Sequence, residues 1–176
     1  MADLRIEIFS PDAKYNFSAF DCGDESLNIF LSEHMARQHG NGILRAYVLI
    51  TTDSQPRIIG YYTLSGSCFE KVRLPSGSRK RKVPYANVPS VTLGRLAVDR
   101  HLQRQGYGGL LVTHAMSVTW RASLTVGVHG FFVEALNLKV RCFYQNLGFI
   151  SLAGANANSL FYPTASMARL FLESEA

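Results

Sequence analysis

The chain has 176 residues, of which 47% are hydrophobic, and a formal net charge of +5. This length matches one domain, 1–176, and the apolar content is enough for a sizeable core, which excludes a disordered chain. The chain holds no run of about 18 apolar residues, and its start, Met1–Arg5, has neither a basic nor an apolar stretch. We therefore expect no membrane span, no signal peptide and a cytoplasmic location.

Hydrophobic patterning in the first third of the chain predicts three strands, over Leu4–Phe9, Leu44–Thr51 and Ile58–Ser67. Turn residues 53–56 join the last two strands and predict a hairpin. Between the first two strands, apolar residues recur at near-helical spacing behind Asp24, whose side chain suits an N-cap. These residues are Leu27, Phe30, Leu31 and Met35.

Positive charge is concentrated in one segment that follows the hairpin. The segment also holds prolines, serines and a glycine, which predict a mobile surface loop. Removing its six cations from the net charge of +5 leaves −1 for the rest of the chain. This concentration favours a polyanionic partner, with RNA phosphates first, while a solvated loop is the alternative. The six cations are Lys71, Arg73, Arg79, Lys80, Arg81 and Lys82.

A strand over Ser90–Val98 then leads through a glycine-rich turn into a helix over Tyr107–Ser123. The first N–H groups of a helix have no intrahelical partner, and the helix dipole also favours an anion there. Neither the P-loop nor the dinucleotide-binding spacing is present. The turn consists of Gln103, Arg104, Gln105, Gly106, Tyr107, Gly108 and Gly109. The predicted apolar face of the helix consists of Leu111, Ala115, Val118 and Ala122.

The last third of the chain predicts a strand, a helix and two closing strands, over Phe131–Ala135, Leu138–Leu147, Phe149–Leu152 and Leu160–Tyr162. Tyr144 lies in the helix, in the string Phe-Tyr-x-x-x-Gly-Phe, and its helical spacing with apolar neighbours is equally typical of a core stripe. The cysteines are an odd number without metal-ligand spacing, so we expect reduced core residues and no metal site. They are Cys22, Cys68 and Cys142.

The pattern Gln103-x-x-Gly106-x-Gly108 resembles the acetyl-CoA-binding motif of the GCN5-related N-acetyltransferases, or GNAT enzymes. The resemblance implies a single α/β (α+β) domain whose mixed, mostly antiparallel sheet is flanked by helices and splayed at the acetyl-CoA-binding strands. It places the pyrophosphate on the turn and the pantetheine along the main chain of Leu96, Ala97 and Val98, with Asn137 as a further contact. Tyr144 is then the general acid, because a phenol with a pKa of about 10 stays protonated at neutral pH.

Longer strings, at 21–31, 60–64, 89–99 and 143–144, are similar to the GNAT toxins of type II toxin–antitoxin modules. This resemblance implies acetylation of the α-amine of the amino acid on charged tRNA, which blocks translation. It also implies a ribbon-helix-helix antitoxin as partner and a homodimer.

Some parts of the site stay open at this level. Asp99 and Glu134 are the candidate bases, although an α-amine with a pKa of about 7.7 to 8.0 needs little help. Arg37 and Arg45 extend the basic surface or are ordinary surface charges, and Arg95 is either structural or substrate-facing. The amino-acid preference is not predicted, and the suggested pocket walls are Phe20, Leu27, Phe30 and Tyr62. The alternatives are a GNAT enzyme for small amines or protein N-termini, and a non-catalytic acyl-CoA- or RNA-binding module.

Overall fold

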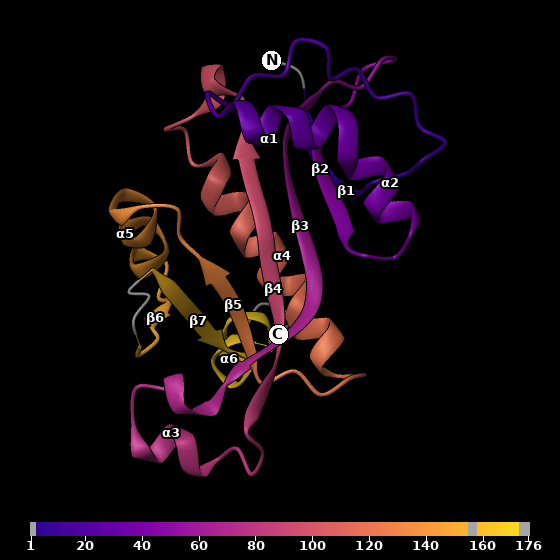
Figure 1. Ribbon diagram of the computed structural model, residues 1–176. Helices are drawn as coiled ribbons and strands as arrows, with labels where there is room; N and C mark the ends of the chain where they lie inside the picture. The colour runs from indigo at the N-terminus through magenta and orange to yellow at the C-terminus, as the bar shows by residue number, and fades with distance from the viewer. Residues whose placement is uncertain (1–2, 155–157, 173–176) are drawn as a thin grey trace. The chain divides into compact units, whose positions relative to one another are not determined.

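The computed structural model describes residues 3–154 and 158–172, in which seven strands form one sheet in the order β1-β2-β3-β4-β5-β7-β6 (Figure 1). Neighbouring strands β4 and β5 are parallel, whereas β1–β2, β2–β3, β5–β7 and β6–β7 are antiparallel. The expectation of a mixed, mostly antiparallel sheet is therefore confirmed. The strands are β1 (Leu4–Ile8), β2 (Arg45–Thr51), β3 (Ile58–Glu70), β4 (Asn87–Val98), β5 (Gly130–Glu134), β6 (Ile150–Ser151) and β7 (Ser159–Pro163).

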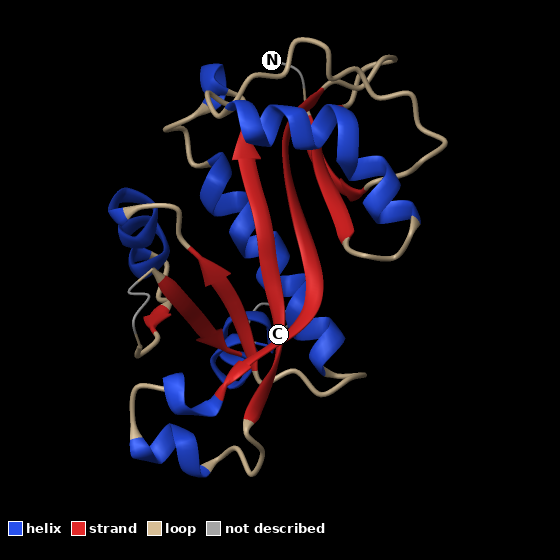
Figure 2. Ribbon diagram, in the orientation of Figure 1, coloured by secondary structure: helices blue, strands red, loops and turns tan. Residues whose placement is uncertain are grey.

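Helices lie between most of these strands along the chain, but in the order of described elements β2 leads directly to β3 and β6 directly to β7 (Figure 2). Within the described residues, none of them combines the length and the apolar character that a membrane crossing needs. They are α1 (Glu25–Ile29), the π-helical η1 (Phe30–His34), α2 (Met35–Gly40), the 3-10 helix η2 (Lys71–Arg73), α3 (Gly77–Arg81), the 3-10 helix η3 (Arg100–Leu102), α4 (Tyr107–Ser123), α5 (Leu138–Asn146) and α6 (Thr164–Leu172).

The described chain divides into two compact units, and the first consists of residues up to Ser65 together with Gly94–Ala115. Side chains alternate between the faces of a strand, so the adjacent residues Tyr61 and Tyr62 serve opposite faces. Tyr61 packs against Phe30 of η1 and donates its hydroxyl to the carbonyl of Leu27 at 2.7 Å. Tyr62 instead forms a hydrogen bond with Nδ1 of His114 on α4 at 2.6 Å. Helices therefore cover both faces of this part of the sheet.

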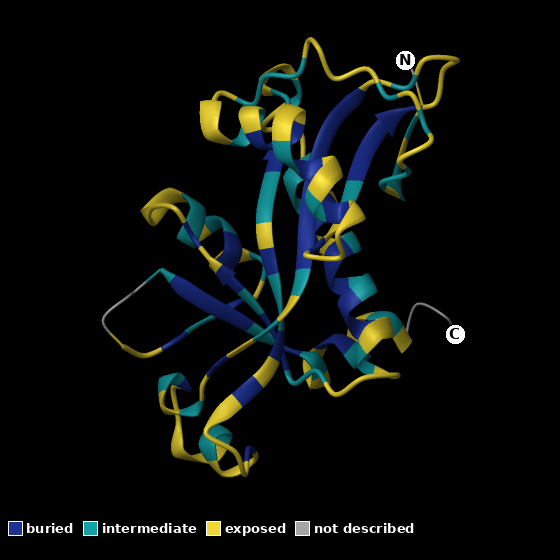
Figure 3. Cartoon of the chain, turned by 45° about the vertical axis from the view of Figure 1, so that its right-hand side comes forward, coloured by how far each residue is buried: buried dark blue, intermediate teal, exposed yellow. Residues whose placement is uncertain are grey.

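The helix at Glu25 begins where the sequence predicts, because the Asp24 carboxylate accepts a hydrogen bond from the N–H of Ser26. On α4 the predicted bounds are confirmed, but the predicted face is only partly right. Leu111 and Ala115 are buried, whereas Val118 is half-buried and Ala122 is exposed. The buried face continues instead through Val112, Met116, Thr119 and Trp120. Figure 3 shows the chain coloured by burial.

The second unit comprises Gly66–Leu93 and the described residues from Met116 onward. One apolar cluster joins β3, the segment after it, β4 and β7 through Phe69, Leu74, Val83, Val88, Leu152 and Phe161. A second group of rings links β5, α5 and β7: Phe149 contacts Phe131, Tyr144 and Tyr162 with centroid separations between 5.2 and 5.7 Å. Aromatic contacts between neighbouring elements therefore hold this unit together.

The cysteines are free thiols, but the expectation that all three lie in the core is wrong. Cys22 is half-buried and packs against the core of the first unit, whereas Cys68 and Cys142 are exposed. Both exposed cysteines lie in regular elements, β3 and α5, at positions whose side chains face solvent.

A buried histidine makes the stability of the first unit depend on pH. Nδ1 of His39 accepts a hydrogen bond from the N–H of Ala46 at 3.1 Å. Burial, reinforced by the Arg45 charge, lowers the pKa of His39 below its usual value. The unfolded chain therefore binds a proton first, at a pH of about 6.5, and stability is lost as the pH falls from there towards the folded-state pKa.

We expect the urea midpoint of the wild-type chain to fall between pH 7.5 and pH 5.5 by more than that of His39→Gln. Glutamine retains an acceptor but takes up no proton, so it removes this contribution, which reaches at most about 1.4 kcal/mol per pH unit. Equal pH dependence in the two proteins contradicts the assignment.

Candidate functional site

The turn between β4 and α4 leaves a row of main-chain N–H groups without partners. Arg104 and Gly106 both adopt left-handed conformations, with φ of 63° and 88°. Within the described residues, the N–H groups of 105–109 make no hydrogen bond, and the first N–H of the helix that is satisfied is that of Leu110, to Gly106 at 3.0 Å. This turn at a helix N-terminus is therefore suited to bind an anion.

Polar side chains around the turn bind its main chain. Nε2 of Gln103 donates to the carbonyls of Val98 and Cys22, both at 2.8 Å, and so ties the turn to the end of β4. Nε2 of Gln105 donates to the carbonyl of His101 at 3.2 Å. These amides bond to the turn itself, so the donors that remain open there are main-chain groups, which the sequence pattern alone does not distinguish.

Asp99 has a structural role at the start of this turn. Its carboxylate accepts hydrogen bonds from the N–H groups of His101 and Asp21 and lies 3.0 Å from Nδ1 of His101. Burial acts in the opposite direction, but these hydrogen bonds keep the pKa of Asp99 below its ordinary value. A carboxylate that holds its charge so firmly is a poor general base. Glu134, the other candidate, is exposed and lies 3.4 Å from the hydroxyl of Ser159.

The pairing of β4 with β5 covers only part of β4. The parallel ladder joins Ser90–Leu93 to Gly130–Val133 and ends there, although β4 continues to Val98. Leu96, Ala97 and Val98, the predicted pantetheine contacts, lie beyond the end of this ladder.

Tyr144 belongs to the core of the second unit and also carries a free hydroxyl. It is 4% exposed and packs edge-on against Phe143 and Phe149. Its hydroxyl makes no hydrogen bond with any described residue. Burial raises the pKa of Tyr144 well above its ordinary value, so the phenol stays protonated at neutral pH. The core interpretation and the proton-donor interpretation are therefore compatible.

Asn137 has a role that the sequence analysis missed. Its Oδ1 accepts a hydrogen bond from the N–H of Val140 at 3.0 Å, which makes it the N-cap of α5, the helix that carries Tyr144. The string Asn-x-x-Val at the start of a helix was the available signal. This capping bond orients the amide at the end of β5.

The six-cation segment is not the mobile loop that the sequence predicts, because it contains the short helices η2 and α3. Ser76 caps α3, and the buried side chains of Leu74 and Val83 anchor the segment in the core of the second unit. Four of its cations, Lys71, Arg73, Arg79 and Lys80, are half-buried, and Arg81 and Lys82 are exposed.

Two arginines of this segment pack on aromatic rings. Arg73 lies over Phe132 and Arg79 over Phe161, at 5.9 and 5.6 Å from the ring centroids. Nζ of Lys71 donates to the carbonyl of Val83 at 3.1 Å. Burial, together with the charges of Lys82 and Arg79, lowers the pKa of the neighbouring His129. Lys82 and Arg79 are therefore close enough to act electrostatically on the same group.

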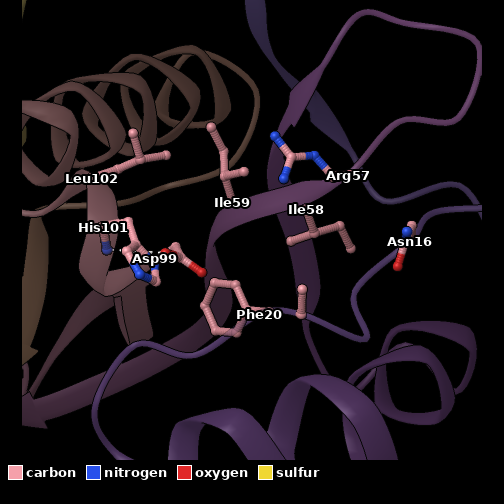
Figure 4. A pocket seen from close by; sticks show the side chains of 9 residues that line it. Asn16, Phe20, Arg57, Ile58, Ile59, Asp99, His101 and Leu102 are labelled. Atoms are coloured by element: carbon pink, nitrogen blue, oxygen red, sulfur yellow. Dashed lines mark hydrogen bonds and ion pairs between the residues drawn. The ribbon is translucent and has the colours of Figure 1, made fainter.

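A cavity of about 320 Å³ lies beside the start of the turn in the first unit (Figure 4). Phe20, Ile58 and Leu102 give it an apolar wall, and Arg57 and His101 also line it. Of the four suggested pocket walls, only Phe20 lines it. Phe20, Leu27 and Phe30 share one core cluster, whereas Tyr62 bonds to His114 on the opposite face of the sheet, so the four residues do not line a single pocket.

The remaining arginines differ in their surroundings. Arg37 is exposed beside His34, and Arg45 donates to the carbonyl of His39 at 2.9 Å, so both have local partners. Arg95 lies over the ring of Phe30, 3.8 Å from its centroid.

Comparison with known proteins identifies relatives over most of the chain. The family model for the acetyltransferase (GNAT) domain matches residues 46–151. A tRNA-acetylating toxin from Mycobacterium tuberculosis is 31% identical over 132 residues, which cover 75% of this chain and 76% of that protein.

Solved structures resemble the chain more closely. AtaT complexed with acetyl-methionyl-tRNAfMet is 58% identical, with a TM-score of 0.93 over 96% of this chain and 99% of that chain. A tyrosine-to-phenylalanine mutant of KacT is 55% identical, with the same TM-score and the same coverages. AtaTR bound with AcCoA is 59% identical, with a TM-score of 0.85 over 96% and 98%. This chain therefore belongs to the GNAT acetyltransferase family.

Proposed function

We propose that this chain is a toxin acetyltransferase that moves the acetyl group of acetyl-CoA to the α-amine of the amino acid on charged tRNA and so blocks translation. The observation that carries the proposal is the turn after β4, whose unpartnered N–H groups at 105–109 form an anion site at the N-terminus of α4. Similarity over 96% of the chain to AtaT in complex with an acetylated aminoacyl-tRNA supports the substrate class.

The residues of the turn fit the pyrophosphate of acetyl-CoA. Arg104 and Gly106 have positive φ, as residues of anion-binding main-chain turns often do, and the amides of Gln103 and Gln105 bond to the main chain. Gly108 and Gly109 keep side chains away from the start of the helix. Beyond the β4–β5 ladder, the main chain of Leu96, Ala97 and Val98 pairs with the pantetheine arm, and Asn137 adds a contact. When bound, acetyl-CoA supplies an acetyl group activated as a thioester, whose leaving group is a thiolate.

Tyr144 serves as the general acid. Its buried phenol holds a proton at neutral pH, and its hydroxyl is not committed to another residue. Tyr144 would donate its proton to the sulfur as the C–S bond breaks and the C–N bond forms, and the proton lost by the newly acylated nitrogen would return to the phenolate. No strong base is required, because a substantial fraction of an α-amine with a pKa of about 7.7 to 8.0 is neutral near pH 7.

The six-cation segment binds the tRNA backbone. Arg81 and Lys82 are exposed at the end of α3, and the other four cations are partly accessible around it. An RNA duplex presents a dense array of phosphates, and a surface of this charge neutralises several of them. Partners proposed from the relatives are an antitoxin of the ribbon-helix-helix class and a second copy of the chain, with the cytoplasm as the location.

The first experiment follows the transfer of labelled acetyl from acetyl-CoA to purified bulk tRNA, either charged or deacylated. We expect label on charged tRNA only, and digestion then identifies the acetylated amino acid. Label on neither RNA, with acetyl-CoA still bound, contradicts the proposal and favours acetylation of a small amine or a protein N-terminus.

Tyr144→Phe removes the proposed acid but retains the ring that packs on Phe143 and Phe149. We expect kcat to fall by about 100-fold or more while the affinity for acetyl-CoA is unchanged. Tyr162→Phe is the matched control, because Tyr162 contacts the same Phe149 ring. This variant also removes one tyrosine hydroxyl from the second unit, but not the proposed acid. Equal rates for Tyr144→Phe and the wild-type chain refute the role of Tyr144.

The triple variant Lys80→Gln, Arg81→Gln and Lys82→Gln tests the basic segment and leaves Arg79 on the Phe161 ring. We expect a higher KM for charged tRNA and a weaker dependence of kcat/KM on salt, because each lost phosphate contact lowers the slope by about one. The control variant removes three exposed cations elsewhere, at Lys14, Arg121 and Arg169. If the two triple variants have the same salt slope, the segment does not bind the tRNA.

A further inference from the structure

The guanidinium of Arg95 is held on an aromatic face inside the first unit. Its central carbon lies 3.8 Å from the centroid of the Phe30 ring, close enough for the plane of the guanidinium to stack on the ring. Phe30 is 3% exposed and packs against Tyr61, so the ring beneath the guanidinium is fixed. Phe30 is the first residue of the π-helical turn η1, and π-helical turns often occur at functional sites.

The donors of this guanidinium are not used within the chain. Among the described residues, Arg95 makes no side-chain hydrogen bond, and no carboxylate lies within 4.0 Å of it. None of its nitrogen atoms is both buried and unsatisfied, so the donors remain accessible to solvent. Arg45 differs in this respect, because its guanidinium donates to the carbonyl of His39 at 2.9 Å.

The main chain at Arg95 is fixed independently. Its N–H donates to Oγ1 of Thr63 at 3.1 Å, and Thr63 is 1% exposed. A Cβ on the preceding Gly94 would lie 2.9 Å from the same oxygen, so only glycine fits there. Backbone and side chain thus hold one cationic group in a defined position while its five donors stay free, which is the arrangement expected of a binding group.

We infer that Arg95 is a positioning residue that binds the phosphodiester next to the terminal, amino-acid-bearing nucleotide of the charged tRNA. This inference rests on the proposed function. A planar fork of donors matches two phosphate oxygens, and stacking on Phe30 holds the fork in place in advance. Arg95 precedes Leu96–Val98 on β4, and three residues of strand span roughly 10 Å, so the phosphate contact lies within one nucleotide's reach of the residues that hold the pantetheine.

The test compares two acceptors that differ by one phosphate. One is the aminoacyl ester of the dinucleotide cytidylyl-adenosine, and the other is the corresponding ester of adenosine, which lacks a phosphodiester. We expect the wild-type chain to prefer the dinucleotide, and Arg95→Met to reduce the ratio of the two kcat/KM values by about tenfold or more, mainly through KM. Methionine keeps a flexible apolar stem on Phe30, and Arg95→Lys, which keeps the charge without the fork, should restore part of the ratio.

The control is Arg5→Met, which removes one charge from an arginine that is already paired with Glu7. An unchanged ratio in Arg95→Met overturns the inference, and a lower melting temperature with that unchanged ratio assigns Arg95 a structural role. A higher KM for acetyl-CoA instead assigns it to the phosphates of the donor and also overturns the inference. If the wild-type chain acetylates neither ester nor charged tRNA, the proposed function fails together with the inference. If it acetylates them and only the ratio is insensitive, the inference alone fails.

Discussion

The course of β4 depends on a steric constraint at Gly94. Oγ1 of Thr63 occupies the place that a side chain at position 94 would need, and the same oxygen accepts the N–H of Arg95. Thr63 is buried, so the strand cannot relieve the crowding by moving this side chain towards solvent. Arg95 and Ala97 therefore face the helices α1 and η1, and the end of the strand meets the turn that Gln103 ties to Val98.

At the turn after β4 and in the six-cation segment, some polar side chains contact the rest of the structure, while other polar groups stay open to solvent. At the turn after β4, the amides of Gln103 and Gln105 and the carboxylate of Asp99 bond to main-chain groups, so the N–H groups of 105–109 remain open. In the six-cation segment, Arg73 and Arg79 pack on rings while Arg81 and Lys82 point to solvent. One part thereby presents open main-chain N–H dipoles and the other presents exposed side-chain charges.

Elements with a strong hydrophobic period were predictable from the sequence, and elements held by other forces were not. The bounds of α4 and the β2–β3 hairpin follow from periodicity and turn residues. The helix α3 consists of glycine, serine and cations, so nothing apolar repeats in it, and its stability comes from the Ser76 cap and from contacts remote in sequence. For α6 a usable signal existed, because Met167, Leu170 and Phe171 recur at helical spacing. Within the site, the glycine pattern located the turn, whereas the stacking of Arg95 on Phe30 joins residues too far apart for any local pattern to reveal.

Leu74 and Val83 are the two apolar side chains that anchor the six-cation segment. Because they provide the anchoring, the exposed charged residues of the segment are not needed for it. Both apolar side chains are buried in the core of the second unit, and Arg81 and Lys82, which lie between them in the sequence, are exposed. Substitutions at exposed surface positions usually change stability little, so the charges of Arg81 and Lys82 can be altered at little cost. The charge of this surface can therefore change while the apolar core to which Leu74 and Val83 attach it stays the same.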